Sequence, residues 1–214
     1  MKKGVIFDLD GTLIHSLPDI AAAMNRSLSR FGLPVFEENA YKYKVGNGVL
    51  KLTERVVGDR KDLYDQVLNA YMEDYAQHNR VNTQPFRGVK ELLKELEKRQ
   101  VPMGVLTNKD QRDAENVLAH FFPQTQFAVI RGRVEGVPLK PDPTGALLIA
   151  STMGVAPADC LYVGDTSTDM NCGRNARMET VGVLWGYRSR EELTANGARH
   201  LIAEPMELIK LLEI

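Results

Sequence analysis

The sequence predicts an α/β protein: a doubly wound parallel sheet with a Rossmann-like core, and a small all-helical cap inserted after the first strand. Three features support this prediction. An uninterrupted apolar run, Val5-Ile6-Phe7, lies near the start, residues 15–84 carry helical periodicity without a strand signal, and strands alternate with helices from Phe86 onward. Short connections between alternating strands and helices favour parallel strands with helices on both faces.

Composition sets the broad class of the protein. The 214 residues are enough for one sizeable core with a small second domain. The 27 Lys and Arg nearly cancel the 28 Asp and Glu, so no global field attracts nucleic acid or a membrane surface. No apolar stretch approaches the roughly 18–20 residues that span a bilayer, and residues 1–4 lack a signal-type apolar region. We therefore expect a soluble cytoplasmic protein that is a monomer or homodimer.

Two acidic residues end the first predicted strand. Val5, Ile6 and Phe7 suit a strand buried on both faces, and Asp8 and Asp10 start out on the same side because side chains alternate along a strand. Two carboxylates crowded beside a buried strand repel each other and are costly to desolvate. A divalent cation or a phosphate-handling site explains both acids, whereas an Asp-Gly turn explains only one.

The segment that follows is predicted to be entirely helical. Ser16 is expected to cap a helix that ends at Gly32, and further helices are expected from about Gly48 and over residues 63–75. The polar run Asn82-Thr83-Gln84-Pro85 is typical of the end of an insertion. The predicted division is therefore a core of residues 1–14 and 85–214, with a helical cap of residues 15–84.

The rest of the chain alternates between the two kinds of element. Strands are expected over residues 103–106, 127–130, 161–163 and 180–184. Helices are expected over residues 89–96, 113–120 and 146–153, from about residue 169, from a capping box at Ser189 and Glu192, and over residues 205–212.

Polar side chains follow several of these strands. In open parallel sheets, ligands bind beyond the carboxyl ends of the strands, which meet at one edge. Lys140, in a proline-rich loop, lies between the predicted strands 103–106 and 161–163. The groups expected to converge come from separate parts of the sequence: Asp8, Asp10, Thr107, Asn108, Lys140, Asp165 and Asp169.

In this order, these residues resemble the four motifs of the haloacid dehalogenase superfamily of phosphotransferases. The matching segments are Asp8-Leu9-Asp10-Gly11-Thr12, Thr107-Asn108, Lys140-Pro141 and Gly164-Asp165-x-x-x-Asp169. The resemblance runs through nearly the whole chain, and the helical insertion is similar to that superfamily's small cap. Val45-Gly46-Asn47-Gly48, Glu54-Arg55 and Trp185-Gly186-Tyr187 resemble the phosphoglycolate phosphatase subgroup.

The resemblance implies Mg²⁺-dependent hydrolysis of a small phosphorylated metabolite through an aspartyl phosphate, with phosphoglycolate as the expected substrate. Asp8 would be the nucleophile, because its carboxylate is ionised at neutral pH without an activating base. Asp10 would give a proton to the leaving oxygen and later take one from water, while Thr107 and Lys140 would stabilise the phosphoryl group.

Metal and substrate contacts are expected from the same set of residues. The expected Mg²⁺ site comprises Asp8, Asp165, the backbone carbonyl of Asp10, and Asp169 either directly or through a water. The expected substrate-binding residues are Asn108, which assists at the phosphoryl group, and the cap residues Gly46, Asn47 and Gly48, whose backbone N–H groups suit a small anion.

Other interpretations of these residues stay open. Thr107 and Asn108 can cap a helix, Asp169 can be a first-turn acid that favours the helix dipole, and Lys140 alone can be a solvated lysine. Pyrophosphate, a sugar phosphate or a nucleoside monophosphate can replace phosphoglycolate as substrate. A catalytically silent relative that binds a partner through its cap is a further alternative.

Three residues outside the motifs carry separate expectations. Arg55 is expected to be an exposed arginine of a cap helix, and His15 lies near the cap hinge, where relatives more often have an acid. Arg177 lies where relatives place a helix-ending glycine, which implies local strain of about 1 kcal/mol.

Overall fold

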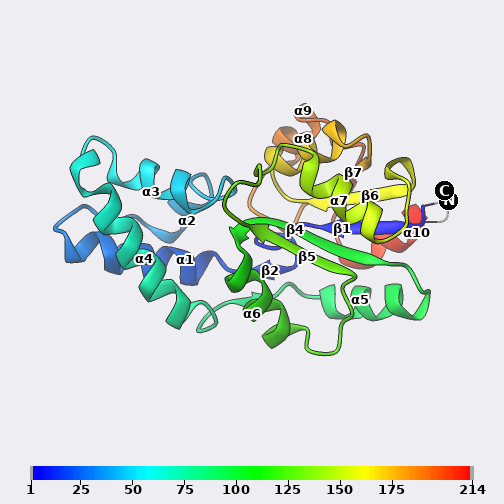
Figure 1. Cartoon of the computed structure of the whole chain (residues 1–214), viewed down its shortest axis with the longest axis horizontal. Coiled ribbons are helices and arrows are strands. Elements are labelled where there is room, and N and C mark those ends of the chain that lie inside the picture. The colour runs from blue at the N-terminus through cyan, green and yellow to red at the C-terminus, as the bar shows by residue number, and fades with distance from the viewer. Residues whose placement is uncertain (1, 213–214) are drawn as a thin grey trace.

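Six parallel strands form the central sheet of the structure, a computed structural model that describes residues 2–212 (Figure 1). The strand order is β5-β4-β1-β6-β7-β8, so the chain winds outward from β1 in both directions and the predicted doubly wound fold is confirmed. The strands are β1 (Gly4–Phe7), β4 (Met103–Asp110), β5 (Val129–Arg133), β6 (Cys160–Gly164), β7 (Glu179–Val183) and β8 (His200–Ile202).

Helices cover both faces of this sheet. One apolar cluster joins β1, β4 and β6 to α5, α6 and α10, and a second joins the opposite face of the sheet to α7 and α8. All four residues of β1 are buried, which explains why its sequence is apolar without alternation. The helices of this part are α5 (Val89–Lys98), α6 (Gln111–Phe121), α7 (Thr144–Thr152), α8 (Ser167–Asn175), α9 (Arg190–Ala195) and α10 (Leu208–Leu212), with short 3-10 turns η2 (Pro157–Asp159) and η3 (Pro205–Glu207).

The helical insertion, residues 16–83, lies between β2 (Ile14–His15) and β3 (Gln84–Pro85). It contains α1 (Leu17–Arg30), α2 (Glu38–Tyr41), α3 (Val49–Val57), η1 (Lys61–Leu63) and α4 (Tyr64–His78). Its helices share an apolar cluster of their own and form a lobe beside the sheet (Figure 1). Because β2 and β3 pair antiparallel, the chain leaves and re-enters the sheet part at one place. The division into a core and a cap at residues 15 and 84 stays a prediction.

The entry into α1 differs from the sequence-based expectation. The prediction that Ser16 caps this helix is wrong, because its hydroxyl donates to Asp10 Oδ1 at 2.5 Å. The backbone N–H groups of Ser16 and Leu17 donate instead to the Tyr187 hydroxyl, at 3.1 and 3.2 Å. A residue after β7 therefore satisfies the helix terminus and leaves the Ser16 side chain available to Asp10.

Some element boundaries also differ. β4 runs past residue 106 to Asp110, so Thr107 and Asn108 lie within a strand and the alternative that they cap a helix is wrong. The short elements α2 and β8 were not predicted, because 3 or 4 residues are too few to show a period. Arg177 has a φ of 58°, the left-handed conformation expected at that helix end.

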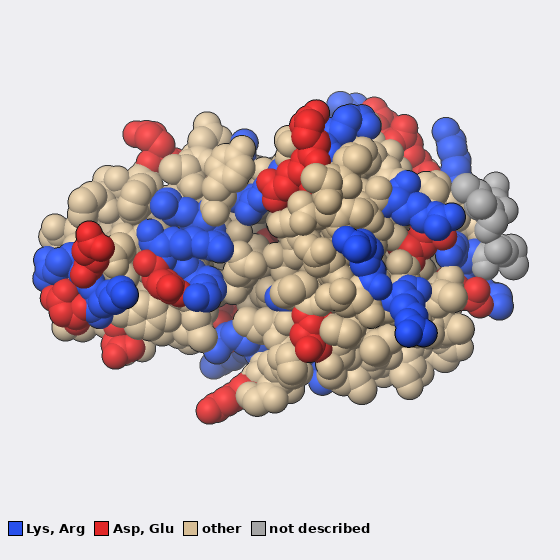
Figure 2. Space-filling model, turned by 90° about the horizontal axis from the view of Figure 1, so that it is seen from above, with Lys and Arg blue, Asp and Glu red and all other residues tan. Residues whose placement is uncertain are grey.

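The surface carries charges of both signs. Figure 2 shows Lys and Arg side chains interspersed with Asp and Glu over the face that it displays, in keeping with the net charge of −1. Within residues 2–212, no helix is long and apolar enough to cross a membrane.

Candidate active site

The carboxyl ends of β1, β4 and β6 bring the predicted site residues to one edge of the sheet. Asp8 directly follows β1, Thr107 lies within β4, and Asp165 directly follows β6. Asp169 lies in the first turn of α8, and Lys140 lies in the loop that precedes α7.

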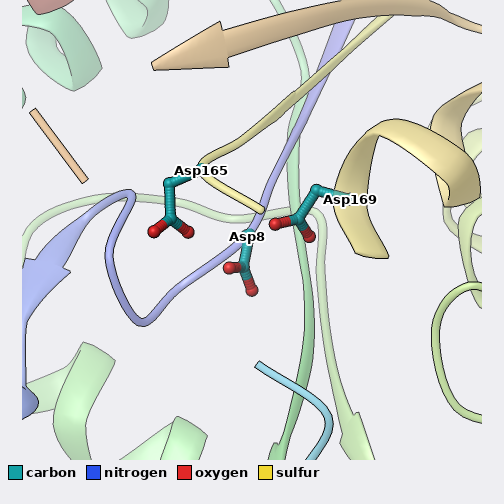
Figure 3. A group of neighbouring side chains, drawn as sticks. All are labelled: Asp8, Asp165 and Asp169. Carbon is teal, nitrogen blue, oxygen red and sulfur yellow. The ribbon is translucent and has the colours of Figure 1, made fainter. Parts of the chain in front are cut away.

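Three buried carboxylates lie close together at this edge (Figure 3). One oxygen each from Asp8, Asp165 and Asp169 lies within 4.8 Å of the others. The Lys140 ammonium donates to Asp8 Oδ1 at 2.6 Å and to Asp169 Oδ1 at 2.8 Å. The arrangement therefore sets three acids against one directly bonded lysine, and all four side chains are buried.

This excess of buried acid shifts the proton affinities. Burial, reinforced by the charge of Asp169, raises the pKa of Asp8 to about 7 despite the neighbouring Lys140. Burial and the charges of Asp169 and Asp8 raise the pKa of Asp165 well above its usual range. A bound cation would reduce the repulsion between the carboxylates and supply the positive charge that the cluster lacks. Carboxylate oxygens are ligands that suit a hard divalent ion. The residues present therefore fit a divalent metal site.

The raised pKa of Asp8 predicts how stability depends on pH. Between the usual value of 3.8 and about 7, folded protein holds a proton at Asp8 that the unfolded chain has released. Raising the pH through this window therefore favours unfolding, by up to about 1.4 kcal/mol per pH unit for one proton. In EDTA, wild type should lose more unfolding free energy between pH 5 and pH 7.5 than Asp8→Asn, measured by urea denaturation. Equal losses in both proteins would contradict the shift.

Asn108 and Asp169 hold Lys140 in place. The Asn108 side chain accepts from the Lys140 N–H at 2.9 Å and donates to the Lys140 carbonyl at 3.2 Å. It also donates to the Gly46 carbonyl at 3.1 Å, which links the sheet to the helical insertion. Asp169 Oδ2 accepts from the N–H and the hydroxyl of Thr166 in a capping box. Asp169 is thus a helix-capping acid and a partner of Lys140 at once.

Two glycines make room for Asp165. Its Oδ2 accepts from the Tyr187 N–H at 2.8 Å. A Cβ atom at Gly11, where φ is 90°, or at Gly186 would overlap the Asp165 side chain. The glycines of the Asp-Gly-Thr and Trp-Gly-Tyr segments therefore allow close packing around this carboxylate.

Asp10 lies beside this cluster and binds a lysine that the sequence analysis did not single out. Lys109 Nζ donates to the two Asp10 carboxylate oxygens at 2.9 and 3.0 Å. Burial opposes the lysine charge, but the Asp10 carboxylate raises the pKa of Lys109 overall. Because residues i and i+2 of a strand share a side, a β4 that continues past residue 106 places Lys109 beside Thr107.

A pocket extends from these groups to the helical insertion. Gly46 and Gly48 line it, whereas Asn47, which was predicted to bind substrate, is not among its described lining residues. The Asn47 side chain instead donates to the Thr168 hydroxyl at 3.0 Å and accepts from Arg55 at 2.7 Å. The pocket is lined from the sheet part by Asp8, Asp10, Thr107, Asn108, Lys109, Asp110, Asp113, Lys140, Thr166 and Tyr187, and from the insertion by Ile20, Val45, Gly46, Gly48, Val49, Leu52, Tyr71 and Tyr75.

Arg55 and His15 lie outside this pocket. Arg55 is exposed on α3, as predicted, and it donates to the Lys44 carbonyl at 2.6 Å, so it braces the loop before α3. His15 packs between the rings of Phe86 and Tyr187, with centroid distances of 5.5 and 6.0 Å. Burial lowers the pKa of His15, in keeping with a packing role at the connection between the sheet and the insertion.

The profile of haloacid dehalogenase-like hydrolases matches residues 5–183. The chain belongs to this family. Among its relatives, the phosphoglycolate phosphatase of Pseudomonas putida is 34% identical over 98% of this chain and 79% of the relative. The N-acetylmuramic acid 6-phosphate phosphatase of Pseudomonas aeruginosa is 31% identical over 99% of this chain and 95% of the relative. A crystal structure from Lactobacillus delbrueckii subsp. bulgaricus superposes with a TM-score of 0.91 and 27% identity, covering 99% of each chain.

Proposed function

We propose that this hydrolase is a Mg²⁺-dependent phosphatase that cleaves phosphate monoesters through an aspartyl phosphate. The observation that supports the proposal most directly is the position of Asp8. Its Oδ1 lies 2.6 Å from Lys140 Nζ, and its carboxylate clusters with those of Asp165 and Asp169. A nucleophilic carboxylate and a phosphate are both anionic, and this arrangement supplies the countercharge that their approach needs. Phosphatase names among the relatives support the same reaction class.

The chain's own residues account for both halves of the reaction. An Asp8 oxygen attacks phosphorus while the bond from phosphorus to the ester oxygen breaks, and Asp10 gives a proton to that leaving oxygen. Water then attacks the phosphorus of the aspartyl phosphate, Asp10 takes a proton from that water, and inorganic phosphate leaves with Asp8 restored. Thr107 and Lys140 face the transferred group, where their hydrogen bonds strengthen as charge moves.

Asp8, Asp165 and the Asp10 backbone carbonyl would hold the cation. Asp169, whose two carboxylate oxygens already bond Lys140 and Thr166, would act through a water. Because all of these ligands are oxygen atoms, they support a hard ion such as Mg²⁺ as the metal. When bound, this ion would neutralise charge on the phosphoryl group.

Phosphoglycolate is the proposed substrate. The backbone at Gly46 and Gly48 lines the pocket over Asp8, and its N–H groups suit the carboxylate of a small leaving group. N-acetylmuramic acid 6-phosphate is a second candidate, because the parallel rings of Tyr71 and Tyr75, 5.3 Å apart, offer the pocket an apolar wall for a sugar.

Other activities have less support. Pyrophosphate, small sugar phosphates and nucleoside monophosphates fit the same chemistry and belong in the same assay. A dehalogenase would have no task for Asp10 or the acidic cluster. The insertion side of the pocket has only apolar, aromatic and glycine residues among its described lining, which does not favour the second phosphate site of a mutase. A silent relative is disfavoured because every motif residue is present.

A panel of phosphate esters tests this proposal. With MgCl₂, purified protein should release inorganic phosphate from p-nitrophenyl phosphate, and EDTA should abolish the release. We expect kcat/KM for phosphoglycolate to exceed that for the other esters by at least about tenfold, the factor that roughly 1.4 kcal/mol of differential binding gives. No release from any ester would refute the proposed reaction, and a higher value for N-acetylmuramic acid 6-phosphate would reassign the substrate.

A cytoplasmic location is proposed with this metabolic role.

A further inference from the structure

The Asp10 carboxyl group is held from both parts of the molecule. On the sheet side, Lys109 Nζ donates to its two oxygens at 2.9 and 3.0 Å. On the insertion side, the Ser16 hydroxyl donates to Oδ1 at 2.5 Å. Lys109 is the ion-pair partner of Asp10, whereas Lys140 pairs with Asp8 and Asp169.

Lys109 is itself held by the helical insertion. Its ammonium donates to the Tyr75 hydroxyl at 2.8 Å and lies 4.8 Å from the centre of the Tyr75 ring. Tyr75 belongs to α4 and is buried, and the Lys109 side chain is only 6% exposed. A chain of contacts therefore runs from α4 through Lys109 to the carboxyl group that the proposed reaction uses as acid and base.

We propose that Lys109 is a positioning residue, which together with Tyr75 orients the Asp10 carboxyl group toward the ester oxygen. This inference rests on the proposed phosphatase function and adds to it a link between the helical insertion and the acid–base group. Lys109 keeps both sets of contacts only while Tyr75 of α4 lies against it, so the position of the helical insertion sets the orientation of the Asp10 carboxyl group.

Orientation is the quantity that these contacts control. A carboxyl group transfers a proton only from within hydrogen-bond reach of the reacting oxygen. Without the Lys109 ammonium, the Ser16 hydroxyl is the remaining side-chain partner of Asp10 among residues 2–212, and a single bond leaves the carboxyl group free to rotate. Misplacement by a small distance is enough to lose much of the benefit of a fixed geometry.

Two esters with different leaving groups separate orientation from general damage. The alkoxide of glycerol 2-phosphate needs a proton to leave, whereas p-nitrophenolate leaves without one. Lys109→Met should lower kcat/KM for glycerol 2-phosphate by about 10- to 100-fold, part of the 10²–10⁴-fold that acid–base catalysis supplies. The loss on p-nitrophenyl phosphate should stay below about threefold, because breaking that bond needs no acid. Equal losses on both esters would overturn the inference, since they would indicate a lost charge or a damaged fold.

Two tyrosine variants on the same helix test the part played by the insertion. Tyr75→Phe removes the hydroxyl that accepts from Lys109, and it should lower kcat/KM for glycerol 2-phosphate selectively by about 3- to 10-fold, the range expected for one lost hydrogen bond. Tyr64→Phe removes a hydroxyl on the same helix that donates to the Leu50 carbonyl and does not line the pocket, and it should leave the ratio between the esters unchanged. Equal changes of this ratio in both variants would refute the role of Tyr75.

A double-mutant cycle decides whether Lys109 acts through Asp10. In an Asp10→Asn background, Lys109→Met should change kcat/KM for glycerol 2-phosphate by less than about twofold, because the group that it orients is already lost. A loss as large as in wild type would overturn the inference. Wild-type protein that cleaves neither ester would instead refute the proposed function, so the two failures are distinguishable.

Discussion

Asp8→Asn should abolish phosphatase activity without unfolding the protein. An amide does not attack phosphorus at a useful rate, so phosphate release from p-nitrophenyl phosphate should fall by at least about 10³-fold. The same change removes one of three buried carboxylates that share a single directly bonded lysine. In EDTA at pH 7.5, the thermal midpoint of unfolding should therefore be equal to or higher than that of wild type.

Asp159→Asn is the matched control for this variant. Asp159 is partly exposed and pairs with Lys3 far from the site, so its replacement should leave activity within about twofold of wild type. Activity in Asp8→Asn above about one tenth of the wild-type value would mean that another group is the nucleophile.

Lys140→Met should weaken both the fold and the activity. Although burial opposes its charge, Asp169 and Asp8 raise the pKa of Lys140, so the buried site holds an ammonium. Its removal leaves three acids in a buried cluster without their bonded cation, which should cost about 3 kcal/mol of unfolding free energy in EDTA. Phosphate release should fall by about 10²-fold or more, because the transferred group loses a charged contact.

A divalent cation offers a sharp check on this interpretation. Saturating MgCl₂ should restore more unfolding free energy to Lys140→Met than it adds to wild type, because the ion replaces the lost countercharge. Lys98→Met is the control, since the Lys98 side chain is 79% exposed and reaches Glu95 only at 4.0 Å. Unfolding free energies of Lys140→Met and wild type that agree in EDTA would contradict a structural role for the buried lysine.

The sequence predicted the elements whose patterns are long or unambiguous. The continuous apolar sequence of β1 is typical of a strand buried on both faces. The apolar stripe of α5 is typical of a helix buried on one face. Asp8 and Asp165 could be placed at one edge because parallel strands end together, whereas Lys140 was assigned to that edge from its place in the ordered set of motifs. Ser16, by contrast, was predicted to cap the helix that follows it, because that is the usual role of a serine at a helix start. Its hydroxyl bonds Asp10 and its N–H bonds Tyr187 only because packing between elements brings these residues together.

Lys109 shows the limit of reasoning from local pattern. In sequence it is one more lysine after a strand, and its role depends on an Asp10 that lies 99 positions away and a Tyr75 that lies 34 positions away. The direction of the Asn47 side chain, which bonds Thr168 and Arg55, likewise depends on how the loop before α3 meets α8.

By itself, the sequence determined the α/β class, the helical insertion and the set of acidic and basic groups at one sheet edge, because hydrophobic period and strand polarity are local properties of the chain. Only the tertiary structure decided which lysine pairs with which acid, which tyrosine holds Lys109 and which glycines make room for Asp165. Those contacts join residues that are distant in sequence, and their energies depend on burial and distance, which no local pattern encodes.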